Sequence, residues 1–135
     1  LIIGLNAVLN YFNDIGLDGL YRKHSIMSEA TRKGFQAIGL ASFAPNNPST
    51  ALSVIMSPDN IDAGIIVKEL KEKYGIIVAG GQDQAKGKIF RITHMGDVHK
   101  DDIISVITAV ENILENTGFD LKKGLASSTA EAIFK

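Results

Sequence analysis

Apolar residues recur along this chain at two spacings, one typical of helices and one typical of strands. Recurrence every three or four residues predicts helices over residues 1–13, 18–38, 61–74 and 99–116, with a shorter terminal helix at 126–134. Short apolar runs bounded by glycine, proline and asparagine predict strands over residues 40–43, 51–56, 76–79 and 88–94.

The order of these elements indicates the fold class. Helices and strands do not alternate strictly, and two pairs of successive strands are close enough to form hairpins. We therefore expect an α+β fold with a small, largely antiparallel sheet of three to four strands. Helices are expected to cover one face of that sheet, because a sheet this small is stable only when its apolar face is buried.

Polar residues at the ends of segments predict where helices begin. Asp59 or Asn60 is expected to cap the helix at 61–74, and Ser127 or Ser128 the terminal helix. The inner face of the helix at 61–74 is expected to consist of the apolar residues that share one stripe: Ile61, Ile65, Ile66, Leu70 and Tyr74.

The first segment, residues 1–13, is apolar on more than one side. A helix of this kind needs a partner surface on each apolar side, and part of that surface is expected to lie outside this chain. The N-terminus has neither an initiator methionine nor a basic region before the apolar residues. It therefore resembles a cut point inside a longer protein rather than a signal peptide.

Composition and charge restrict the class of protein. The 135 residues suffice for one domain, and 45% hydrophobic with 21% charged residues is typical of globular proteins. A net charge of −1 argues against nucleic acid or an anionic membrane as a partner, because such binders carry a basic excess. The absence of cysteine excludes disulfides and thiolate metal sites and is compatible with the cytoplasm. No apolar run approaches the roughly 18 residues of a membrane span.

Arg91 is the strongest candidate for a functional side chain. It lies in the strand at 88–94 between Phe90 and Ile92, so it faces the opposite side of the sheet from both. An arginine in a cleft requires a carboxylate or phosphate partner for its planar group. Composition alone favours the other interpretation, a solvated arginine on a polar face, since most arginines are exposed.

Three further features have a structural and a functional interpretation. His94, at the end of the same strand, is expected to donate to a backbone carbonyl rather than to act in a site. The glycine-rich loop at 80–87 lacks the spacing of a phosphate-binding loop and is expected to be a connection. One cluster of polar residues could suggest a metal site: Asp97, His99, Asp101 and Asp102. Enrichment of acidic residues at the start of a helix is the commoner explanation for such a cluster.

The order and spacing of several short motifs indicate a family. The principal motif is Gly80-Gly81-Gln82-Asp83, Lys86-Gly87 and Phe90-Arg91-Ile92, followed by His94. Agreement extends to Leu1-Ile2-Ile3-Gly4-Leu5, to residues 19–24, to Ala30-Thr31-Arg32 and to Phe43-Ala44-Pro45. The chain thereby resembles the C-terminal domain of class V pyridoxal-phosphate-dependent aminotransferases of the serine–pyruvate and alanine–glyoxylate type. It is especially similar to the branch labelled soluble hydrogenase small subunit.

This resemblance implies a fold, a reaction and one site residue. It implies the C-terminal domain of fold-type I aminotransferases, with residues 1–16 as a helix leading from a missing large domain and 17–135 as the small domain. Arg91 then binds the α-carboxylate of the substrate. The reaction moves an amino group between a small amino acid, such as serine or alanine, and a 2-oxo acid such as glyoxylate or pyruvate.

The resemblance also places the cofactor chemistry outside this chain. Pyridoxal phosphate is expected in the full-length enzyme, whose lysine, pyridinium partner and phosphate contacts lie upstream of Leu1, and no cofactor is expected on this segment alone. No catalytic, cofactor-binding or metal-ligating residue is assigned here. The expected partners are the two substrates, the chain's own large domain and, in a homodimer, a second copy.

Two alternatives and one departure from the family pattern accompany this interpretation. The first alternative is a non-catalytic binding or regulatory module with the same fold, since fold does not determine function. A hydrogenase component is disfavoured, because no cysteine is present to ligate iron–sulfur or nickel. Thr93 occupies a position where the family usually has glycine. If that glycine permits a close backbone approach, a branched side chain crowds the end of the strand, which affects the geometry near His94 more than Arg91.

Overall fold

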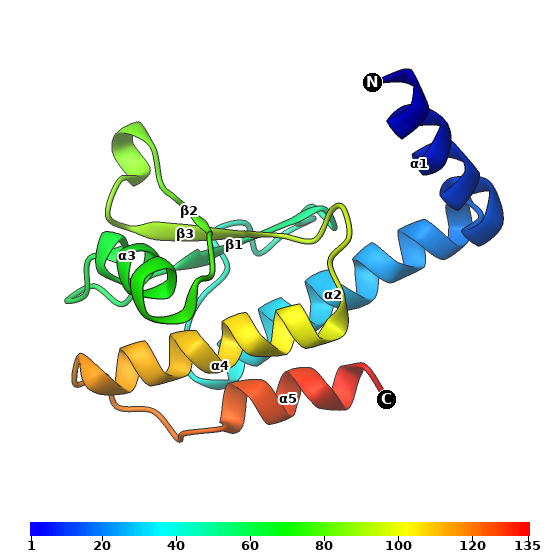
Figure 1. Cartoon of the computed structure of the whole chain (residues 1–135). Helices are drawn as coiled ribbons and strands as arrows, with labels where there is room; N and C mark the ends of the chain where they lie inside the picture. The colour runs from blue at the N-terminus through cyan, green and yellow to red at the C-terminus, as the bar shows by residue number, and fades with distance from the viewer.

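The computed structural model describes residues 1–135 and contains five α-helices and three strands (Figure 1). The helices are α1 (Ile2–Ile15), α2 (Leu17–Ala37), α3 (Ala63–Tyr74), α4 (Lys100–Asn116) and α5 (Leu125–Ile133). The strands are β1 (Leu52–Met56), β2 (Ala79–Gly80) and β3 (Ile89–Thr93), and a 3₁₀ turn, η1 (Asp83–Ala85), lies between β2 and β3. The predicted α+β class is confirmed.

The sheet has the order β1-β3-β2, and both pairs are antiparallel. Successive side chains of a strand point to opposite faces, so the register divides the sheet into two faces. The covered face contains Ser53, Ile55, Phe90 and Ile92. The open face, as we call the opposite side, contains Leu52, Val54, Met56, Ala79, Ile89, Arg91 and Thr93.

Two of the predicted strands differ from the structure. Residues 40–43 form only one isolated bridge, between Ser42 and Ile55, and the strand predicted at 76–79 is reduced to Ala79–Gly80. The second difference arises from the end of α3. Gly75 adopts a left-handed conformation there, and the Ile76 N–H donates to the carbonyl of Leu70. Ile76 therefore completes the helix end and cannot begin a strand.

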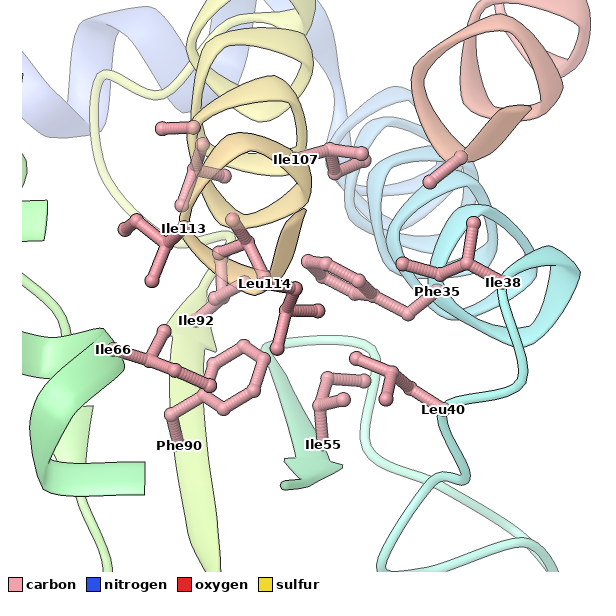
Figure 2. Packing of buried hydrophobic residues seen from close by; sticks show 14 of the residues in the cluster. Phe35, Ile38, Leu40, Ile55, Ile66, Phe90, Ile92, Ile107, Ile113 and Leu114 are labelled. Atoms are coloured by element: carbon pink, nitrogen blue, oxygen red, sulfur yellow. The ribbon is translucent and has the colours of Figure 1, made fainter. Parts of the chain in front are cut away.

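The hydrophobic core lies between the covered face and helices α2, α3 and α4 (Figure 2). Phe90 of β3 and Phe35 of α2 meet edge to face, with their ring centroids 5.6 Å apart. Such pairs contribute about 0.5–1.5 kcal/mol beyond the area that they bury. Ile66 of α3 and Leu114 of α4 are fully buried beside them. The covered face is thus largely an apolar core, whereas no α-helix covers the open face.

Helix α5 packs on α2 and α4, on the side away from the sheet (Figure 1). Its close approach depends on small residues. A Cβ atom at Gly34 of α2 would lie 2.9 Å from the Ala126 carbonyl oxygen and 3.3 Å from the Ala130 Cβ. Gly34 is therefore required by packing.

The N-terminus of α5 is capped from inside the core, and neither Ser127 nor Ser128 is the cap. The helix begins after Gly124, and no side chain of its own caps it. Instead the Glu111 carboxylate, which is 1% exposed, accepts hydrogen bonds from Ala126 N at 2.9 Å and Ser127 N at 3.4 Å. The positive end of the helix dipole compensates the buried charge.

The start of α3 also differs from its prediction. The Ile61 N–H donates to the Pro58 carbonyl in a preceding turn, so the helix begins later. Asp62, rather than Asp59 or Asn60, caps it by accepting from Gly64 N at 2.6 Å.

The inner face of α3 is narrower than its sequence stripe predicts. Ile66 and Leu70 are buried, whereas Ile65 and Tyr74 are 44% and 39% exposed. The expectation that Ile65 and Tyr74 belong to the inner face is wrong, because α3 packs against the rest of the molecule on one side only.

Helix α1 extends away from the rest of the molecule (Figure 1) and contains no buried residue. The exposed large apolar residues of α1 and its preceding residue are Leu1, Ile2, Ile3, Leu5, Val8, Leu9 and Tyr11. Separately, none of the helices combines the length and apolar character that crossing a membrane requires.

We expect the 135-residue chain to self-associate through α1 at high concentration, because a continuous exposed apolar surface is an association site. The double substitution Leu5→Glu with Leu9→Glu should then reduce the weight-average mass measured by sedimentation equilibrium. Ile77→Glu, which alters an isolated apolar residue that is 82% exposed, is the matched control. A chain that sediments as a monomer at every concentration would contradict this expectation.

Candidate functional site

Arg91 lies at the centre of the open face. Strand β3 is the middle strand of the sheet, and Arg91 is paired with Val54 of β1 on one side and Ala79 of β2 on the other. No helix packs on this face (Figure 1). The fold therefore presents one cation, among small and apolar side chains, on a surface that no α-helix covers.

The guanidinium of Arg91 has one protein partner. Its Nε–H donates to the carbonyl oxygen of Gly80 at 3.0 Å, and no carboxylate lies within 4.0 Å of it. A guanidinium has five N–H donors, so the four on its terminal nitrogens have no acceptor in this chain. Arg91 is half-buried, which limits its hydration. These features suit a planar anionic ligand such as a carboxylate.

Thr93 is a further residue of the open face, at the end of β3. Its side chain is exposed on the open face, two residues beyond Arg91, and its Oγ1 accepts from Met95 N at 3.3 Å. The Thr93 hydroxyl also donates to the Ala51 carbonyl oxygen at 3.5 Å. Thr93 thus contributes a hydroxyl to the same surface as Arg91.

His94 lies on the other side of the sheet and is not brought together with Arg91. It is fully buried, and its Nε2 lies 2.8 Å from the Ser53 hydroxyl, so the expected backbone carbonyl partner is wrong. Its Nδ1 has no hydrogen-bond partner. Burial lowers the pKa of His94 to about 4, with smaller contributions from Arg32 and His24. His94 is thus a neutral core residue near neutral pH.

The glycine-rich loop folds back over the edge of the open face. Its 3₁₀ turn brings the Ala85 carbonyl against Gly81, where a Cβ atom would lie 2.0 Å from the Ala85 oxygen and 2.9 Å from Ile89 Cγ1. This contact explains why Gly81 is glycine. It also buries Ile89, the only large open-face residue that is shielded in this way.

The acidic cluster serves the start of α4. The carboxylate of Asp102 accepts from His99 N at 2.8 Å, and His99 Nε2 lies 3.0 Å from Asp97 Oδ1. Across the chain, no group of three or more potential metal ligands is brought together.

The lysines of the chain lie in environments unlike that of a typical Schiff-base lysine. Such a lysine needs an environment that lowers its pKa, usually by burial. No lysine here is buried. The pKa of Lys73 is raised by its hydrogen bond to Glu69, and that of Lys123 by its hydrogen bond to Glu115.

Individual proteins similar to this chain are found both by sequence and by structure. No protein-family model matches the chain. A serine–glyoxylate aminotransferase from Methylorubrum extorquens is 30% identical over the whole chain, which covers 34% of that protein. A protein named soluble hydrogenase, small subunit, from Synechococcus is 31% identical over 88% of the chain and 31% of its own length.

A solved structure shares the fold. Pyridoxamine–pyruvate aminotransferase from Mesorhizobium loti is similar with a TM-score of 0.90 and 25% identity, over 97% of this chain and 34% of that one. The chain spans about a third of the length of the curated relatives that it matches.

Proposed function

The chain belongs to the class V aminotransferases, whose C-terminal domain it matches in sequence and fold, and from this premise we propose its function. It serves as the small domain of an enzyme that moves an amino group from a small amino acid, such as serine or alanine, to a 2-oxo acid such as glyoxylate or pyruvate. The enzyme uses pyridoxal phosphate, which supplies the electron sink for the reaction.

The observation that carries this proposal is the free guanidinium of Arg91 on the open face. Amino acids and 2-oxo acids share a carboxylate next to the reacting carbon. A two-point pair between that carboxylate and Arg91 fixes the position of the substrate and its rotation. Orientation of this kind can lower a reaction barrier by roughly 7–11 kcal/mol in total, of which Arg91 provides one part.

The remaining parts of the site come from outside this chain. Because no lysine here fits the cofactor, we assign its lysine and its phosphate contacts to a large domain that precedes Leu1 in the full-length protein. Residues 1–16 lead from that domain, and residues 17–135 form the small domain. In this assembly the open face meets the large domain, and a homodimer completes the enzyme.

The proposal is tested on the full-length protein loaded with pyridoxal phosphate. Amino-group transfer is measured with serine and alanine as donors and with glyoxylate and pyruvate as acceptors, by chromatographic analysis of the products. Turnover with at least one donor and acceptor pair is the expected result. A full-length protein that binds the cofactor but transfers no amino group would favour the non-catalytic module.

The 135-residue chain alone should not catalyse transamination. It should form only scattered adducts with pyridoxal phosphate at surface lysines, because none of its lysines is buried. Borohydride trapping followed by peptide mass spectrometry measures the distribution of those adducts. One stoichiometric adduct at a single lysine, accompanied by turnover of an amino acid, would show that the chain carries its own cofactor site.

A further inference from the structure

The Arg91 side chain reaches the free edge of the sheet, and the backbone pairing shows how. The Gly81 N–H donates to the Ile89 carbonyl, so these two residues form a hydrogen-bonded pair. Such pairs alternate with non-hydrogen-bonded ones along an antiparallel ladder. Gly80 and Phe90 are therefore a non-hydrogen-bonded pair, and the Gly80 carbonyl points away from β3. Since β2 is an edge strand, this carbonyl faces outward.

To donate to the outward carbonyl of Gly80, Arg91 has to cross β2. The residue directly opposite Arg91 on β2 is Ala79, whose side chain points to the same face. A methyl group leaves room for the arginine chain above it, whereas a longer side chain would occupy that path. Ala79 is exposed, so its small size is not a requirement of the core.

The hydrogen bond to Gly80 also determines which donors remain for a ligand. A guanidinium can grip a carboxylate from its side, through Nε and one terminal nitrogen, or from its end, through both terminal nitrogens. Because Nε–H is engaged at 3.0 Å by Gly80, only the end-on arrangement is available. The Gly80 carbonyl is itself held in place, since the turn after it packs against Gly81 without space for a Cβ atom.

We propose that the Ala79–Gly80 edge of β2 positions Arg91 for end-on binding of the substrate carboxylate, an inference that rests on the function proposed above for Arg91. Ala79 and Gly80 are positioning residues in this arrangement: Ala79 leaves the path open, and Gly80 fixes the rotation of the guanidinium. A carboxylate that approaches the edge of the sheet then meets two parallel N–H donors already oriented toward it.

The test uses the full-length enzyme with its cofactor and two donors that differ only by the carboxylate, serine and ethanolamine. Ala79→Leu should lower kcat/KM for serine about tenfold, the equivalent of one neutral hydrogen bond, by displacing the guanidinium from Gly80. The rate with ethanolamine should not change, so the serine-to-ethanolamine ratio falls. Ala79→Val, which favours the strand conformation, gives a second variant with a smaller loss in the same direction.

Ala132→Leu is the matched control, because it makes the same change at an exposed position of α5. It should leave the ratio unchanged. A folded Ala79→Leu enzyme with the wild-type ratio overturns the positioning role, provided that Arg91→Ala lowers that ratio. If Arg91→Ala leaves the ratio unchanged as well, the substrate-binding role of Arg91 itself is overturned. The two proposals therefore fail in distinguishable ways.

Discussion

Arg91→Ala in the full-length enzyme should lower kcat/KM for amino acids by about thirtyfold to several thousandfold. Loss of one partner from a desolvated, charge-assisted pair costs about 2–5 kcal/mol, and each 1.4 kcal/mol is a factor of ten. The effect should appear in kcat as well as in KM, because the contact orients the reacting bond in addition to binding the substrate. Steady-state kinetics with serine or alanine measure it.

The variant Arg91→Lys distinguishes the contribution of the positive charge from that of the planar guanidinium. Lysine retains the positive charge but has neither the planar pair of donors nor an Nε–H for Gly80. It should therefore recover only part of the lost efficiency. Cofactor affinity, measured by absorbance titration, should remain near the wild-type value in both variants, because its anchors lie outside this chain.

Arg22→Ala, which removes an exposed arginine of α2, is the control for a change of net charge. If the Arg91→Ala enzyme keeps the wild-type kcat/KM for amino acids, Arg91 is a solvated strand residue. That is the interpretation that composition alone favours.

The free energy of unfolding should fall by about 3 kcal/mol between pH 6.5 and pH 4 through His94 alone. Its pKa is about 4 in the folded state, against an ordinary value of 6.5 that applies once the chain unfolds. Between these values the unfolded chain binds a proton that the folded chain excludes, so acid favours unfolding. Well above pH 6.5 and well below pH 4 the contribution of His94 is constant.

Urea unfolding at pH 7, 5.5 and 4.5 measures this dependence. His94→Asn removes the titration, although the changed core also lowers the stability at pH 7, so the informative quantity is the slope with pH. His99→Asn, at an exposed histidine, should retain the wild-type slope. If His94→Asn and wild type lose stability equally between pH 6.5 and pH 4, His94 does not titrate with a lowered pKa.

The sequence predicted the buried apolar residues well, because the spacing of apolar residues within one helix or strand shows which face each of them occupies. Ile66 and Leu70 lie on a helical stripe, and Phe90 alternates with Arg91 along a strand, so their faces follow from local spacing alone. The same alternation placed Arg91 opposite to the core. Its freedom from acidic partners, however, depends on what lies nearby in space, and only the structure shows that.

Three features that sequence reasoning missed depend on partners distant in the chain. The cap of α5 is Glu111, fifteen residues before Ala126, whereas capping rules consider only adjacent residues. The partner of His94 is Ser53, 41 residues earlier, on the neighbouring strand. Ala79 and Gly80 lie beside Arg91 only because β2 pairs with β3 in one specific register. Long-range pairing of this kind leaves no periodic signal.

The carboxylate of Glu111 also affects the order in which the chain can fold during synthesis. Helix α4 leaves the ribosome before α5, so this charge is made before the backbone donors that it needs. Burying an unpaired carboxylate is strongly unfavourable. The nascent chain therefore cannot complete the packing of α4 on α2 until α5 has emerged.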